Sequence, residues 1–338
     1  MLYAGIDLHK RSTHIVVTDR DGLKVGDKNM ACDPALIRKF FSKYEEPLEA
    51  VIEATANWPW LVRQLRADGI NPHLAHPLKV KAIASAKIKN DRIDATVLAH
   101  LLRSNLIPES YMASEAEQQV RELIRFRHRL VKEQTRLKNT IHTLLAKQNL
   151  VSPVTDLYGV KGREWLDKVA SSLTITEQLV VKTSLTHLGE LQQHLKDLMP
   201  AIKLAYEADS QAKIIQSIPG FGPYTALVVS VECGDISRFT SDKQLTAYVG
   251  IIPSTHSSGG STRHGGLTKT GNPYVRWVLT QAVYRAIKTD PYLKYQHQRL
   301  AERIGNKKAT IAIARRLLVS TYYMITRQQH YVFREVPN

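Results

Sequence analysis

Four carboxylates fall at positions from which they could share one divalent metal ion. Asp7 and Glu53 each end an apolar run typical of a buried strand, and Asp91 and Asp94 are three residues apart at the start of a helical pattern. Strand ends are where open α/β sheets place their sites, and three-residue spacing puts two helical side chains on one face. Acids this close repel one another unless a cation is bound, and carboxylate oxygens suit Mg²⁺ or Mn²⁺. Taken singly, each acid has a plainer explanation as an exposed strand end or a helix-capping residue.

A second reactive group lies in a stretch rich in serine and glycine, residues 254–260. Such composition ordinarily indicates a flexible loop. Here Arg263 and Lys269 follow it, and no carboxylate lies nearby to neutralise them. Positive neighbours stabilise both an alkoxide and the charge of a phosphoryl transition state. The stretch is therefore a suitable setting for a serine nucleophile that attacks a phosphodiester.

The charge of the chain points to a polyanionic partner. The 338 residues carry a formal net charge of +16, and residues 243–334 contain fifteen Lys or Arg against Asp290 and Glu302. DNA or RNA is the simplest partner for such a surface. Two cysteines exclude a disulfide framework, and no apolar run reaches membrane-spanning length, so we expect a cytoplasmic protein with no membrane partner.

Residues 1–108 are predicted to form a mixed α/β domain with the element order β-β-β-α-β-α-β-α. An acid followed by proline, Asp33-Pro34, starts the first helix. The predicted strands are 2–7, 14–18, 23–30, 48–53 and 71–75, and the predicted helices are 34–43, 58–68, 78–86 and 92–103.

Residues 113–217 are predicted to be helical. Ser114 and Glu117 form a capping-box pattern for a long helix that runs to about Gln148, with leucine at every seventh position. Arg127 and Gln134 interrupt that apolar seam, which leaves either a coiled coil or an ordinary amphipathic helix. A second helical stretch, 176–208, can return antiparallel to the first.

Residues 218–338 are predicted to be mainly helical. Gly220 and Gly222 lie in a turn that is similar to a helix-hairpin-helix element, in which backbone N–H groups approach phosphate; the alternative is a tight helix connection without a ligand. Later helices are expected at 274–287, 292–304 and 309–328. Lys307 and Lys308 stand where the helix dipole disfavours cations, which suggests a phosphate partner.

The acidic positions and the strand order resemble the RuvC and ribonuclease-H type of nuclease domain. Gly5-Ile6-Asp7, Ile52-Glu53-Ala54-Thr55 and Asp91-Arg92-Ile93-Asp94-Ala95 resemble the motifs of the DEDD insertion-sequence transposases of the IS110 family. Ala56 departs from the glycine usual in that family. The resemblance implies a metal site made by Asp7, Glu53, Asp91 and Asp94.

The C-terminal motifs resemble the transposase domain of the same family. Gly250-Ile-Ile-Pro253, then Ser258-Gly259, Lys269-x-Gly271-Asn272 and Val275-Arg276-Trp-Val-Leu occur in the family's order. The resemblance implies that Ser258 is the nucleophile and forms a covalent phosphoserine, with Ser257 the neighbour most easily confused with it. It further implies donor and target DNA, a non-coding bridge RNA as guide, and a coiled coil that assembles a dimer or tetramer. Arg263, Lys269 and Arg276 are expected nucleic-acid contacts.

Two other functions remain possible from the sequence. One is a metal-dependent, structure-selective nuclease in which water attacks and Ser258 is only a loop residue. The other is a non-enzymatic architectural binder of DNA or RNA. The sequence also leaves open whether Asp91 is a metal ligand or only supports Asp94, and whether Ser258 acts within its own chain or on a partner. A bacterial or archaeal, nucleoid-associated location is expected.

Overall fold

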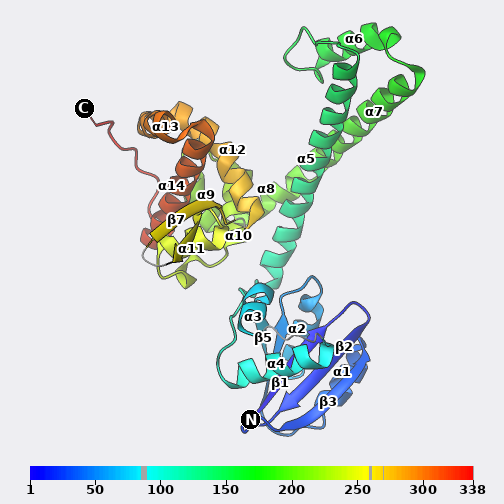
Figure 1. The fold of residues 1–338 in the computed structure, drawn as a ribbon, viewed down its shortest axis with the longest axis vertical. Coiled ribbons are helices and arrows are strands. Elements are labelled where there is room, and N and C mark those ends of the chain that lie inside the picture. The colour runs from blue at the N-terminus through cyan, green and yellow to red at the C-terminus, as the bar shows by residue number, and fades with distance from the viewer. Residues whose placement is uncertain (85–89, 259–260, 269, 338) are drawn as a thin grey trace. The chain divides into compact units, whose positions relative to one another are not determined.

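The computed structural model describes residues 1–84, 90–258, 261–268 and 270–337, with the backbone alone described for 253–258 and 261–264 (Figure 1). The chain consists of two compact units, Met1–Met112 and Ala113–Asn338. Among the described residues, no helix is long and apolar enough to cross a membrane.

A five-stranded mixed sheet forms the centre of the first unit. Its order is β3-β2-β1-β4-β5, in which β1 pairs antiparallel with β2 and parallel with β4. The parallel part brings the carboxyl ends of β1, β4 and β5 to one edge of the sheet. The strands are β1 Leu2–Leu8, β2 Ser12–Thr18, β3 Lys24–Ala31, β4 Leu48–Glu53 and β5 Asn71–Ala75.

Helices cover both faces of this sheet. Successive residues of a strand point to opposite faces, so one strand contributes apolar side chains to two cores. On β4, Ile52 packs into the core with α1 and α2, whereas Val51 packs into the core with α3 and α4. These helices are α1 Pro34–Phe41, α2 Trp58–Ala67, α3 Pro77–Ile83 and α4 Asp91–Arg103. The predicted mixed α/β organisation and element order are confirmed, with most boundaries within two residues.

The second unit begins with a long helix, α5 Glu115–Lys147, which starts at the predicted Ser114–Glu117 capping box. Helix α7 Ile175–Asp197 runs back alongside α5, as Figure 1 shows, and the two pack through Ile141 and Leu188. The predicted helix 176–208 is divided in two, because α7 ends at Asp197 and α8 Met199–Ala208 starts with Pro200 in its first turn. A helix that the sequence did not indicate, α6 Val160–Val169, lies between α5 and α7.

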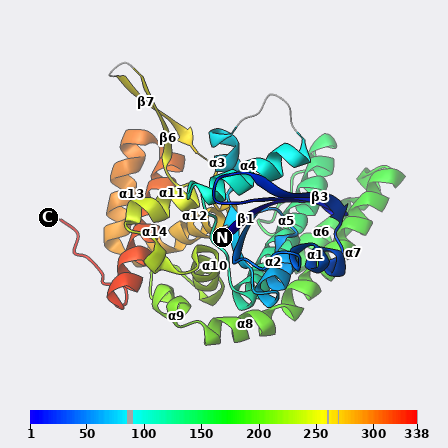
Figure 2. The same cartoon turned by 90° about the horizontal axis from the view of Figure 1, so that it is seen from below.

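The rest of the second unit is a helical core from which a β-hairpin extends, as Figure 2 shows. The helices are α9 Ser210–Gln216, α10 Pro223–Cys233, α11 Asp242–Val249, α12 Pro273–Thr289, α13 Pro291–Ile304 and α14 Asn306–Arg327. The hairpin strands are β6 Pro253–Ser258 and β7 Ser261–Leu267. The loop expected at 254–260 is therefore wrong for 254–258. Residues 253–258 instead pair antiparallel with 261–267, and this pairing outweighs the loop-like composition.

A buried ion pair joins α5 to this helical core. The Glu232 carboxylate is fully buried, and the Arg125 guanidinium donates to both of its oxygens at 2.6 and 2.7 Å. The Asn272 amide donates to the same carboxylate at 2.7 Å. Because Asn272 also caps α12 through its side-chain oxygen, one buried acid links α5, α10 and the start of α12.

We expect Arg125→Met to lower the free energy of unfolding by about 3–5 kcal/mol, since it leaves a buried carboxylate without its charge partner. Urea denaturation of the full chain measures this change. Arg129→Met, on an exposed position of the same helix, should change stability by less than about 0.5 kcal/mol. Equal effects of the two substitutions would contradict a stabilising role for the buried pair.

Candidate active site

The acids at the ends of β1 and β4 are neighbours in the sheet. Ile6 and Ile52 are the last paired residues of these parallel strands, and Asp7 and Glu53 follow them directly. The loop after Glu53 holds the loop after Asp7, since the Asn57 amide donates to the His9 carbonyl at 2.7 Å. The structure therefore brings the first two predicted motifs to one edge of the sheet.

Gly5 allows the third motif to reach that edge. A Cβ at this position would lie 1.9 Å from the Ala95 carbonyl oxygen and 2.5 Å from the Ala99 amide nitrogen. Helix α4 therefore lies directly on the backbone of β1, with its first residue, Asp91, near the end of that strand. The start of α4 is also fixed by Arg92, whose Nε contacts Asp27 Oδ2 at 2.6 Å.

We expect Gly5→Ala to impair both stability and metal-dependent activity. The added methyl group overlaps backbone atoms, so α4 must move away from β1 and Asp91 must move away from Asp7. Urea denaturation measures the loss of stability, and isothermal titration with Mn²⁺ and a DNA cleavage assay measure the losses of metal binding and activity. Gly189→Ala, the same substitution on α7, serves as the control, because a Cβ at Gly189 meets nothing within 4 Å. Unchanged Mn²⁺ binding in Gly5→Ala would contradict the positioning role.

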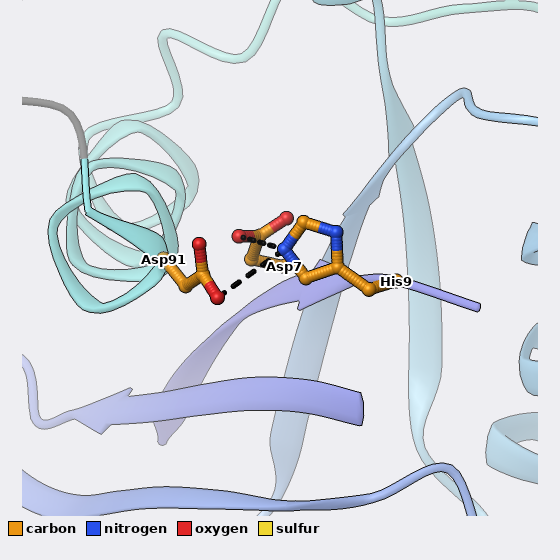
Figure 3. A group of neighbouring side chains, drawn as sticks. All are labelled: Asp7, His9 and Asp91. Atoms are coloured by element: carbon orange, nitrogen blue, oxygen red, sulfur yellow. Dashed lines mark ion pairs between the residues drawn. The ribbon is translucent and has the colours of Figure 1, made fainter. Parts of the chain in front are cut away.

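Three side chains converge at the site shown in Figure 3: Asp7, His9 and Asp91. The Nε2 atom of His9 lies 3.2 Å from Asp7 Oδ2 and 3.3 Å from Asp91 Oδ2. Asp7 is largely buried, with 16% of its side chain exposed, whereas Asp91 is 49% exposed. Two carboxylates directed at one small region form an arrangement that suits a cation.

The electrostatics of the cluster also favour a cation. Burial raises the pKa of Asp7; the His9 charge opposes this, while the charges of Asp91 and Asp94 raise the pKa further. Ionised Asp7 is therefore destabilised in the absence of added positive charge. The carboxylate oxygens fit Mg²⁺ or Mn²⁺, whereas an imidazole ligand is more usual for other transition metals.

The predicted set of four acids is brought together only in part. Within the described residues, the group with ligand atoms inside 4.8 Å of one another contains Asp7 and Asp91 but neither Glu53 nor Asp94. Asp94 is close enough to influence Asp7 through its charge, and Glu53 lies at the adjacent strand end. The sequence reasoning missed His9, although its position two residues after Asp7 could have indicated it, since histidine is a common metal ligand.

The base of the serine hairpin is closely packed, although its tip is not described. Gly250 ends α11 with φ +72°, and a Cβ there would lie 2.7 Å from the Gly271 amide nitrogen. The Arg276 guanidinium donates to the Val249 carbonyl at 2.7 Å. The entry to β6 and the exit from β7 are thereby held together. The side chains of Ser257, Ser258 and Arg263, and all of Lys269, lie outside the described residues, and for Ser258 only its place at the end of β6 is known.

Other expected nucleic-acid contacts have different surroundings. Gly220 packs against α12, where a Cβ would lie 2.6 Å from the Ala286 amide nitrogen, as in a tight helix connection. Gly222 is the N-cap of α10 and faces open space. Lys307 and Lys308 are exposed in the first turn of α14, where a phosphate could reach them.

Comparison with known proteins identifies the class. Residues 4–149 match a DEDD transposase family of the IS110 type, and residues 212–298 match the family described as "Transposase IS116/IS110/IS902 family". The transposase for insertion sequence element IS1111A of Coxiella burnetii is 31% identical over 290 residues, which cover 83% of this chain and 78% of that protein. A probable family 20 transposase of Pseudomonas aeruginosa is 26% identical and covers 97% of both chains.

The mixed sheet with acids at its edge, together with these matches, defines a DNA transposase, an enzyme that cleaves and rejoins DNA. The chain belongs to the IS110/IS116 family of insertion-sequence transposases. Membership of a DEDD family also indicates that the enzyme uses a divalent metal ion.

Proposed function

We propose that this transposase cleaves DNA through a covalent bond to Ser258, assisted by a metal site that Asp7 and Asp91 form with Glu53 and Asp94. The Ser258 Oγ attacks the phosphorus of one phosphodiester and loses its proton. The bond to one deoxyribose oxygen breaks, and that oxygen leaves as a hydroxyl after it takes up a proton. A hydroxyl of another strand then attacks the phosphoserine and restores Ser258, so strands are rejoined without ATP.

The observation that carries this proposal is the convergence of Asp7, His9 and Asp91 at the edge of the sheet. A bound divalent ion would stabilise negative charge on the reacting phosphate. His9 is positioned by the backbone contact from Asn57 and can orient either carboxylate. The basic composition of residues 243–334 supports DNA binding around the serine hairpin.

We further propose that a non-coding RNA guides the enzyme and that it works as a homo-oligomer. Both proposals follow from the family resemblance. In RNA-guided systems, base pairing with the RNA selects the DNA sequence, whereas the protein binds through charge and shape. The serine and the acids belong to different compact units, so an active site could combine them within one chain or across two chains.

The proposal is tested by DNA cleavage with Mg²⁺ or Mn²⁺, followed by denaturation in detergent. We expect a protein–DNA adduct that resists denaturation and does not form in EDTA. Cleavage without any adduct at any time would instead favour the hydrolytic nuclease, in which water attacks the phosphodiester.

A further inference from the structure

A cavity of about 960 Å³ lies in the second unit between α13, α14, strand β7 and the chain that follows α14. One face of α14 forms its longest wall, and the small residues Ala312 and Ser320 on that face leave space. Cavities that bind small ligands are typically about 300–1,000 Å³. This cavity is large enough for one nucleotide together with the phosphate group of its neighbour.

The lining is strongly basic. Within the described residues, it includes five cationic side chains and neither aspartate nor glutamate. Such a concentration of one charge sign attracts an anion. The five are Lys308, Arg315, Arg316, Arg327 and Arg334.

Aromatic rings accompany these cations. Tyr323 is 41% exposed, and the Arg327 guanidinium lies 5.0 Å from the centre of its ring. The Arg334 guanidinium lies 5.8 Å from the centre of the Tyr292 ring. Aromatic rings and guanidinium planes are both surfaces on which nucleic-acid bases stack.

The chain after α14 is fixed as a wall of the cavity. The Tyr331 backbone amide donates to Ser217 Oγ at 2.9 Å, and the Tyr331 hydroxyl donates to the buried Asp290 carboxylate at 2.6 Å. Val332 nevertheless remains 74% exposed beside the cavity. The anchored segment therefore leaves uncovered apolar surface that a base could cover.

We propose that this cavity binds one unpaired nucleotide of a single-stranded nucleic acid, with its base against Tyr323 or Tyr292 and its phosphates on the arginines. An acidic peptide would satisfy the cations but leave the rings uncovered, whereas a nucleotide satisfies both. DNA is the substrate of a transposase, and strand exchange creates unpaired segments. RNA offers the same chemistry, and the experiment below separates the two sources.

The cavity lies beside the hairpin that carries Ser258. Gly265, Gly266 and Leu267 of β7 line it, and Leu267 pairs with Pro253 on β6. Ser258 is five residues from Pro253, at most about 17 Å along an extended strand. A strand held in the cavity can therefore continue along the hairpin towards Ser258. The cavity proposal itself does not require Ser258 to be the nucleophile.

Binding of fluorescent twelve-nucleotide oligo(dT), oligo(U) and a DNA duplex of equal length to the full-length Ser258→Ala protein tests the proposal without cleavage. We expect Tyr323→Ala to weaken single-strand binding about tenfold, as for loss of one stacked base, and to leave duplex binding within about twofold. Tyr284→Ala, at an exposed tyrosine on α12 outside the cavity, is the matched control and should have little effect. Arg316→Ala tests the contribution of charge in the same way, since Arg316 lines the cavity. Its control is Arg303→Ala, at an exposed arginine on α13 outside the cavity lining.

Cross-linking by oligonucleotides with 5-iodouracil locates the base, and we expect the label on peptide 317–327 or 289–294. A stronger effect with oligo(dT) assigns the site to DNA, a stronger effect with oligo(U) assigns it to RNA, and equal effects support the shared stacking chemistry. Equal losses in Tyr323→Ala and Tyr284→Ala, losses that extend to the duplex, or full competition by polyglutamate would overturn the proposal.

Discussion

Asp7→Asn should reduce metal-dependent DNA cleavage by at least about 1,000-fold while DNA affinity stays within a few-fold of the wild type. Asp7 is the most buried member of the cluster and lies at the strand end nearest α4. The substitution replaces a charged carboxylate ligand by a neutral amide oxygen, which weakens metal binding at a site that must stabilise the transition state by several kcal/mol. Single-turnover cleavage and fluorescence anisotropy measure the two quantities.

A stability measurement separates this effect from misfolding. Because the folded-state pKa of Asp7 is raised, its ionised form costs stability at neutral pH, and Asn should increase the free energy of unfolding in EDTA. This gain should be lost below the unfolded-state pKa of about 3.9, where Asp7 is protonated in both states. Asp21→Asn, at an exposed acid in the β2–β3 turn, should change neither activity nor stability. An inactive but less stable Asp7→Asn protein would contradict this explanation.

Ser258→Ala should abolish the covalent adduct, a loss of at least about 10⁴-fold, because no other group in the proposed reaction carries the transferred phosphoryl. DNA binding should be unaffected, since a single hydroxyl contributes little to a large basic interface. Gel electrophoresis under denaturing conditions, with labelled DNA, measures the adduct.

Ser257→Ala is the matched control, since it removes the same atom one residue earlier on β6. We expect it to retain adduct formation within about tenfold. If Ser257→Ala loses the adduct and Ser258→Ala keeps it, the nucleophile is Ser257. Adduct formation by both single variants and by the double variant would exclude both serines.

Much of the first unit could be predicted from sequence because local signals and burial agree there. Asp33-Pro34 starts α1 as expected, and the apolar run before Glu53 is a buried strand. The helix predicted at 92–103 is also present and begins one residue earlier, at Asp91, where the Asn90 side chain accepts from the Arg92 amide. These features depend on neighbouring residues in the chain, which pattern analysis captures.

The rest depends on contacts between distant segments. The role of Gly5 comes from the backbone of Ala95 and Ala99 on α4, far along the chain, and the role of His9 comes from its distance to Asp91. Likewise, Arg276 was expected to contact nucleic acid, yet its half-buried guanidinium donates to the Val249 carbonyl, which closes the base of the hairpin. The sequence shows that a side chain is cationic, but it does not show whether that side chain already donates hydrogen bonds within the folded protein.

Mass spectrometry of the denatured adduct tests the central claim most directly. Wild-type enzyme is allowed to cleave DNA with Mg²⁺, then digested with nuclease and trypsin, which releases the hairpin serines in peptide 244–263. We predict a nucleotide phosphate linked to Ser258 in that peptide. Complete DNA cleavage with only unmodified peptide 244–263, at early and late times, would contradict the account and indicate hydrolysis by water.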